Sequence, residues 1–141
     1  MTIKNVKNLI EDFFINHIEI NDIKYGDKKD LTAFKDLQYP LVNYEYQDSL
    51  IRQDGETVMK FEIIVGDLAD KESDFDVIVH CDIIAKDFIN FLENHEDIEF
   101  NSNIGIVPFS DDFGDRVSGV IFNISFIVFR GFCKDNIPLK Y

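Results

Sequence analysis

The feature that most restricts the fold is a long alternating pattern between Val117 and Arg130. Successive side chains of a β-strand point to opposite faces, so one face of this strand carries Val120, Phe122, Ile124, Phe126 and Val128. The opposite face carries Gly119, Ile121, Asn123, Ser125, Ile127 and Phe129. A strand that is apolar on one face and half apolar on the other usually has protein on both sides. For a chain of 141 residues, another copy of the same chain is one source of that second covering.

Two stretches have the three-and-four residue spacing that is typical of amphipathic helices. The first helix is predicted to begin after Thr2, a suitable N-cap, and its apolar face carries Ile3, Val6, Ile10, Phe13 and His17. The second is predicted to begin after Ser73, which with Asp76 resembles a capping box, and to end near Asn94 or His95. Its buried stripe carries Val77, Cys81, Ile84, Phe88 and Leu92.

Five extended runs complete the predicted elements: Tyr39–Tyr46, Thr57–Val65, Asp97–Phe100, Ile104–Phe109 and Val117–Arg130. Asp54-Gly55 predicts a tight turn between the first two runs, and Ser110–Asp115 predicts an acidic turn between the last two. Charged residues without periodicity from Asp27 to Asp36 indicate a surface loop. The order α-β-β-α-β-β-β contains no βαβ repetition. We therefore expect one α+β domain over residues 1–141, with a mostly antiparallel sheet of about five strands and both helices on one face.

The net charge of −13 comes from 14 basic and 27 acidic residues. This excess argues against binding nucleic acid by neutralising phosphates, which requires clustered Lys and Arg, and against binding an anionic membrane surface. The simplest interpretation is solubility; the alternative is a surface that passes close to nucleic acid without binding it. The chain contains no apolar run of the ~20 residues that span a bilayer and no signal-peptide core, so we expect it to be made in a cytosol.

The acidic turn is the first candidate for a functional site, because its carboxylates could bind a metal ion. Its carboxylates, Asp111, Asp112 and Asp115, are of the kind that binds Ca²⁺ or Mg²⁺. Their spacing does not match an EF-hand loop, so we interpret the segment as a turn in which Gly114 takes a positive φ angle. Asp112-Phe113-Gly114 matches the magnesium-binding triplet of protein kinases in letters only, because the other kinase motifs are missing from the sequence.

The histidines and cysteines show no arrangement that points to catalysis. His17, His80 and His95 are too scattered for a zinc site, which needs four convergent ligands. Cys81 and Cys133 are far apart, and we expect both to be reduced and structural, as is usual in cytosolic proteins. The sequence therefore predicts no catalytic residue, no metal site and no cofactor.

The C-terminal quarter carries a family resemblance. The segments Pro108–Asp115 and Val117–Val120, followed by Cys133 and Ile137-Pro138, resemble small virion proteins of phages that infect Bacteroidetes, including crAss-like phages. In those proteins a Phe-x-Asp-x-Phe-x-Asp turn leads through a glycine-containing strand to a Cys…Ile-Pro ending. The order of elements is also similar to that of the tail-terminator and neck proteins of tailed phages, which are α+β domains that assemble into rings.

The resemblance implies a non-enzymatic ring subunit of the virion neck or tail top, made in the cytoplasm of the host bacterium. It implies a homo-oligomer of six or twelve copies in contact with neighbouring neck and tail proteins. DNA would pass through an acidic lumen without specific binding. We expect subunit contacts at the outer face of the last strand, in the acidic turn and in the loop from Asp27 to Asp36. The predicted interface residues are Ile121, Asn123, Ser125, Ile127, Phe129, Asp111, Asp112, Phe113 and Asp115.

Two functions of other classes remain open on the sequence. One is a cytosolic interaction module, such as an immunity or anti-defence protein that mimics DNA with its acidic surface. Such a module binds a basic partner with an affinity that falls as the salt concentration rises. The other is a small-ligand-binding protein or an enzyme, which needs a deep pocket with convergent polar groups.

Overall fold

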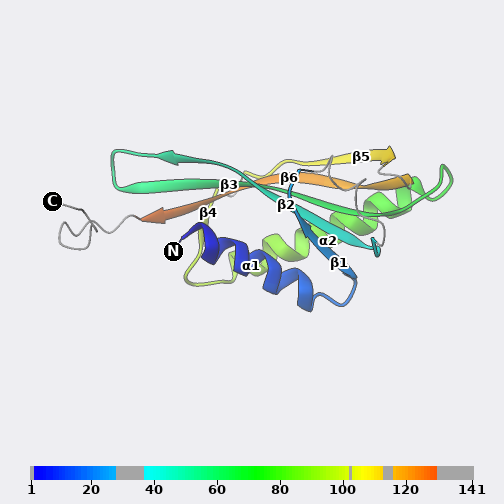
Figure 1. Cartoon of the computed structure of the whole chain (residues 1–141), viewed down its shortest axis with the longest axis horizontal. Coiled ribbons are helices and arrows are strands. Elements are labelled where there is room, and N and C mark those ends of the chain that lie inside the picture. The colour runs from blue at the N-terminus through cyan, green and yellow to red at the C-terminus, as the bar shows by residue number, and fades with distance from the viewer. Residues whose placement is uncertain (1, 28–36, 102, 113–115, 130–141) are drawn as a thin grey trace.

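The structure is a computed structural model that describes residues 2–27, 37–101, 103–112 and 116–129. Two helices, α1 (Ile3–Asn16) and α2 (Asp74–Glu93), lie on one face of a six-stranded sheet (Figure 1). The strands are β1 (Asp22–Tyr25), β2 (Leu41–Ile51), β3 (Glu56–Leu68), β4 (Glu99–Phe100), β5 (Ile106–Asp112) and β6 (Arg116–Phe129). The predicted α+β class and the placement of both helices on one face are confirmed.

The sheet is mixed, because β1 pairs in parallel with β2 while the other pairs are antiparallel. The strand order is β1-β2-β3-β6-β4, and β5 also pairs with β6. The sequence analysis missed β1, which makes the sheet six-stranded rather than five-stranded. Asn21 and Gly26, on either side of this four-residue strand, resemble turn signals, and the strand is specified mainly by its pairing with β2.

The core lies between the helices and the inner face of the sheet. The predicted apolar face of β6 is buried except for the half-buried Val128, and the register pairs it with the buried face of β3. Phe88 of α2 joins the layers: its ring centroid lies 5.1 Å from Phe13, 4.9 Å from Phe14 and 6.5 Å from Phe122. The remaining buried residues of α2 are Cys81, Ile84, Ala85 and Leu92.

The first helix is capped as predicted, since Thr2 and Asn5 form a reciprocal capping box. The predicted capping box at Ser73 is wrong. Ser73 has a helical backbone conformation and makes no side-chain cap; its hydroxyl accepts a hydrogen bond from the Asp70 N–H instead. The Asp70 carboxylate accepts from the backbone N–H groups of Glu72 and Ser73, and these bonds lower its pKa.

Two other boundaries differ from the prediction. β5 continues through Asp112, so Ser110 to Asp112 belong to a strand rather than a turn, because their backbone pairs with Arg116 to Ser118 of β6. The β2–β3 hairpin turns at Gly55, which has the positive φ angle expected from the Asp-Gly pair, but both strands are longer than predicted. As a result, one end of the sheet projects beyond the helices (Figure 1).

Candidate functional site

The outer face of the sheet, which points away from the helices, carries five of the nine predicted interface residues. Ile121, Ser125 and Ile127 are half-buried, Asn123 is exposed, and Phe129 is 71% exposed. Asp111 and Asp112 lie in β5, where only their backbone is described, and Phe113 and Asp115 lie outside the described residues. Most of the predicted loop between Asp27 and Asp36 also lies outside them.

Strand pairing divides this outer face into two apolar patches with a polar band between them. The band is the row Glu45, Glu62 and Asn123, which are neighbours across β2, β3 and β6. On one side of it, Ile64, Ile121 and Val107 form a row across β3, β6 and β5. The outer face is therefore not one continuous hydrophobic surface.

The patch beside β5 is covered by the chain itself over β3, whereas Val107 of β5 is 60% exposed. Gly66 and Gly119 face each other across β3 and β6, and the ring of Phe109 reaches Gly66. A Cβ atom at Gly66 would lie 3.4 Å from Phe109 Cζ and 2.8 Å from Val117 Cγ1. Ile64 in the same patch is only 3% exposed. At this position the second covering of β6 comes from the same chain.

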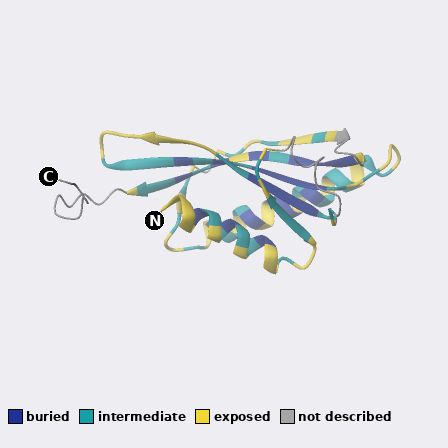
Figure 2. Ribbon diagram, in the orientation of Figure 1, coloured by how far each residue is buried: buried dark blue, intermediate teal, exposed yellow. Residues whose placement is uncertain are grey.

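The patch at the projecting end of the sheet is open. We name it the sheet end: it consists of Leu50, Val58, Ile127 and Phe129 on the outer face. Leu50, Val58 and Ile127 are direct neighbours across three strands, and Leu50 is 57% exposed. Figure 2 shows this end of the molecule as mainly exposed and intermediate residues, with no helix over it. The sheet end is a solvent-exposed part of the half-apolar face that the alternating pattern of β6 predicted.

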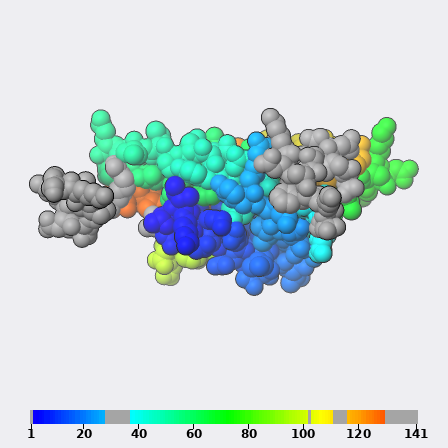
Figure 3. Space-filling model, in the orientation of Figure 1, coloured from blue at the N-terminus to red at the C-terminus, as the bar shows by residue number. Residues whose placement is uncertain are grey.

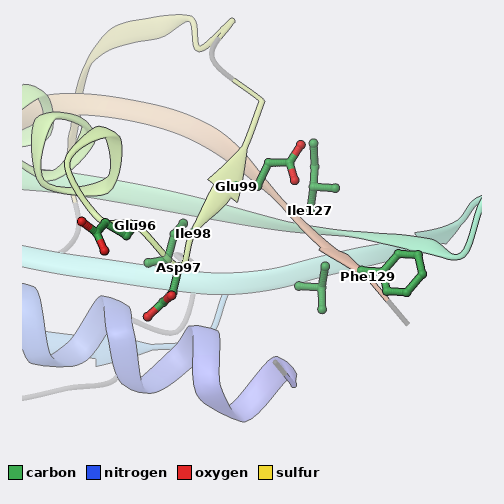
Figure 4. A pocket seen from close by; sticks show the side chains of 7 residues that line it. Glu96, Asp97, Ile98, Glu99, Ile127 and Phe129 are labelled. Atoms are coloured by element: carbon green, nitrogen blue, oxygen red, sulfur yellow. The ribbon is translucent and has the colours of Figure 1, made fainter. Parts of the chain in front are cut away.

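A shallow groove of about 350 Å³ lies beside the sheet end (Figure 4). The carboxylate-bearing side chains of Glu96, Asp97 and Glu99 line one part of it, and Ile127 and Phe129 line the other. A second groove, of about 550 Å³, runs along α1 and has a mainly apolar lining that includes Leu9, Phe13, Ile18 and Phe91. Both grooves are open to solvent, unlike the deep pocket with a few convergent polar groups that typifies a small-ligand site.

A second exposed apolar surface lies on α2, and the sequence analysis missed it. Phe75, Val79 and Ile83, which we name the α2 stripe, are 74%, 42% and 52% exposed. Their spacing of four residues places them along one side of the helix. The same spacing was visible in the sequence, but the stronger buried stripe of α2 dominated the pattern.

A polar group built around Asp74 lies at the start of α2. Its Oδ1 atom accepts hydrogen bonds from Ser110, at 2.6 Å, and from Ser118, and Arg116 lies 3.7 Å away. The two serine bonds and the guanidinium lower the pKa of Asp74. These contacts join the start of α2 to β5 and β6, so their role is structural.

The residues with catalytic potential are occupied by contacts within the fold. His17 Nε2 lies 3.0 Å from Asp87 Oδ2, and its Nδ1 accepts from the Glu19 N–H at 3.2 Å. Burial raises the pKa of the Cys81 thiol to about 12, which keeps it protonated and unreactive. Cys133 lies outside the described residues. In the described part of the chain, no three His, Cys, Asp or Glu side chains gather as a metal site.

Comparison with known proteins gives no relative: no protein-family model matches the chain, and no curated protein sequence is similar to it. None of the described helices is both long enough and apolar enough to cross a membrane.

Proposed function

We propose that the protein is a structural subunit that assembles with copies of itself into a ring. The observation that carries this proposal is the pair of exposed apolar surfaces, the sheet end and the α2 stripe. Exposed apolar patches rimmed by polar residues are typical of protein–protein interaction sites. Five of their side chains are at least two-fifths exposed: Leu50, Phe129, Phe75, Val79 and Ile83.

The energetic scale of such contacts favours a closed assembly. Burying an exposed large apolar side chain stabilises an interface by roughly 1 to 2 kcal/mol, so these five residues supply on the order of 5 to 10 kcal/mol. The cost of associating two molecules is of similar size, about 4 to 15 kcal/mol. A single contact is then weak, whereas a ring gains one more contact than an open chain of the same length.

We further propose that this ring belongs to the neck or tail top of a tailed phage. The resemblance of the C-terminal quarter to phage virion proteins supports this assignment. The net charge of −13 is consistent with it, because a lumen lined by acidic side chains would let DNA pass without binding its phosphates.

The proposal is tested by the mass of the purified protein, measured by light scattering over a range of concentrations, and by negative-stain images. We expect closed rings of six or twelve copies, with a mass that does not change when duplex DNA is added. A mass of 16.4 kDa for the dominant species at every concentration would refute the proposal.

One observation favours a second function, that of an acidic module for a basic partner. Glu96, Asp97 and Glu99 line one groove, and Figure 4 shows their carboxylates pointing in different directions around it. This alternative predicts a monomer that binds a basic protein, with an affinity that falls at least tenfold between low and physiological salt. Ring assembly without such a partner would exclude it as the main function.

A further inference from the structure

We infer that the unpaired edge of strand β2 is a dimer interface, at which β2 of a second copy adds in the antiparallel direction about a two-fold axis. The occupant of this edge is thus another copy of the chain, and the two sheets join into one. The inference concerns a strand edge rather than a face of the sheet. It goes beyond the proposed ring and does not rest on it.

Only the first part of β2 has a neighbour on the side away from β3. There β1 pairs with Leu41–Tyr44, and in the described part of the chain no strand pairs with the rest of β2 on this side. Residues 47–51 are all exposed. In Figure 3 the cyan to green atoms of β2 and β3 run along the upper left of the visible face. An unpaired strand edge is a template for a further strand.

A hydrogen bond of the hairpin shows which backbone groups point outward from this edge. The Arg52 N–H donates to the Glu56 carbonyl at 2.9 Å, so the backbone of Arg52 points toward β3. Because successive backbone groups of a strand alternate between its two sides, those of Ser49 and Ile51 point away from β3. Within the described ranges, neither of these two residues has a backbone partner on that side.

The opposite edge of the sheet is less suited to strand addition. β5 carries Pro108 at its centre, and proline has no N–H to donate. Proline on an edge strand is one of the ways in which native sheets prevent pairing with another chain. β2 holds no proline between Leu41 and Ile51. Its unpaired part is therefore the edge that accepts another strand.

The outward groups restrict the register of the two strands. Residues that exchange hydrogen bonds in an antiparallel pair must both point at the partner strand. With Leu50 on the two-fold axis, Ser49 of each copy lies opposite Ile51 of the other, and both pairs exchange their backbone hydrogen bonds. The two Leu50 side chains then meet at the axis, which covers a residue that is 57% exposed in the single chain.

Side-chain charge favours this register over its neighbours. It places Asp48 of each copy opposite Arg52 of the other, and opposite charges on facing strands stabilise a pair. Arg52 also lies 3.3 Å from Glu56 of its own chain, so it lies between carboxylates of both copies. Moving the register by two residues places Asp48 opposite either Leu50 or Asp54, which is an apolar side chain or a like charge.

A two-fold contact is isologous and closes with two copies. It therefore adds to the contacts of a ring, which needs a second contact, and rings of six or twelve copies hold a whole number of such pairs.

The test places one cysteine on the two-fold axis of the full chain. In a Cys133→Ser background, which leaves only the buried Cys81, Leu50→Cys puts two thiols opposite each other with Cα atoms about 4.5 Å apart. Asp48→Cys is the matched control two residues earlier on the same face of β2. Its two copies are about 14 Å apart along the strands, beyond the reach of a disulfide.

We expect Leu50→Cys, treated with oxidised glutathione, to form a covalent dimer on non-reducing gels, and Asp48→Cys to form at least tenfold less. The measurement is made at 0.15 M salt, where charges more than about 8 Å apart are largely screened, because each copy carries a net charge of −13. Circular dichroism and thermal unfolding establish that every variant is folded.

A second pair of variants tests the backbone contact itself. Ser49→Pro, added to Leu50→Cys, removes an outward N–H and leaves the pairing with β3 intact. Ser49→Ala is its control, because both changes remove the hydroxyl but only proline removes the N–H. We expect the yield of covalent dimer to fall at least tenfold with proline and to stay unchanged with alanine.

Three results would overturn the inference: no covalent dimer from Leu50→Cys, equal yields from positions 48 and 50, or equal yields with Ser49→Pro and Ser49→Ala. These results leave the proposed ring intact, because its test is the mass of the wild-type protein. A wild-type mass that stops at two copies would support the β2 pairing and contradict the ring.

Discussion

At Gly119 of β6 the backbone of β3 lies too close to leave space for a side chain. A Cβ atom there would lie 1.9 Å from the Val65 carbonyl oxygen and 2.8 Å from Gly66 Cα. Both neighbours are backbone atoms of the central pair of strands, so neither can move without disturbing the sheet.

Replacing Gly119 with Ala should therefore lower the free energy of unfolding by about 3 kcal/mol or prevent folding. Gly105→Ala is the matched control, because no atom lies within 4 Å of its added Cβ. We expect that control to change the stability by no more than about 0.5 kcal/mol. Urea unfolding followed by circular dichroism measures both, and equal stabilities of the two variants would contradict the packing described for Gly119.

Asp74 makes the stability of the fold depend on pH. Its carboxylate accepts hydrogen bonds from Ser110 and Ser118, so its pKa is lower in the folded protein than in the unfolded chain. Such a group stabilises the fold above its unfolded pKa of ~3.9, and this stabilisation is lost as the pH falls through the folded pKa.

In Asp74→Asn, the fall in unfolding temperature between about pH 5 and pH 2 should be shallower than in the wild type. Asp76→Asn, which removes an exposed carboxylate from the same helical turn, controls for the change in net charge. Thermal unfolding at several pH values gives the comparison. Parallel curves for Asp74→Asn and the wild type would show that the serine contacts do not stabilise the charged form.

Helix α2 presents different surfaces on its two sides. The inner side packs Phe88 among Phe13, Phe14 and Phe122, and thereby joins α1, α2 and the sheet. The outer side carries the exposed Phe75 of the α2 stripe. Two phenylalanines of one helix thus have different roles, one in the core and one on the surface.

Phe88→Ala should lower the free energy of unfolding by about 3 to 5 kcal/mol, since it leaves a cavity where three elements meet. Phe75→Ala, measured at the same low protein concentration, should cost less than about 1 kcal/mol. Urea unfolding gives both values. A similar cost for the two substitutions would mean that α1 and α2 do not pack through Phe88.

The shape of the protein restricts how copies of it can assemble. Two of its exposed apolar surfaces, the sheet end and the α2 stripe, lie toward different ends of a long molecule, and a third lines the groove along α1 (Figures 1 and 2). A contact between such ends closes into a ring only when its rotation divides a full turn, and otherwise it extends into a filament.

Mass photometry at increasing protein concentration distinguishes these outcomes. We expect one dominant mass, a fixed multiple of 16.4 kDa, because closure removes the free ends. A continuous series of masses that lengthens with concentration would identify a filament and would contradict the ring.

Much of the fold could be predicted because it depends on local patterns. The alternation in β6 identified its buried face, the spacing around Phe88 identified α2, and Asp54-Gly55 identified the hairpin turn. β1 escaped prediction because four residues carry too little periodicity and the strand depends on its pairing with β2. The capping box at Ser73 was wrong because Asp70, three residues earlier, bonds that serine instead.

The alternation in β6 was sufficient to predict that one face is buried and that the other is mixed, because side-chain direction follows directly from strand geometry. It could not show where on that mixed face the apolar residues remain open. That depends on which strands are neighbours: Phe109 of β5 covers Gly66, while Phe129 at the end of β6 is 71% exposed. Local patterns determine the faces of each element, whereas contacts between distant segments determine which faces stay available to a partner.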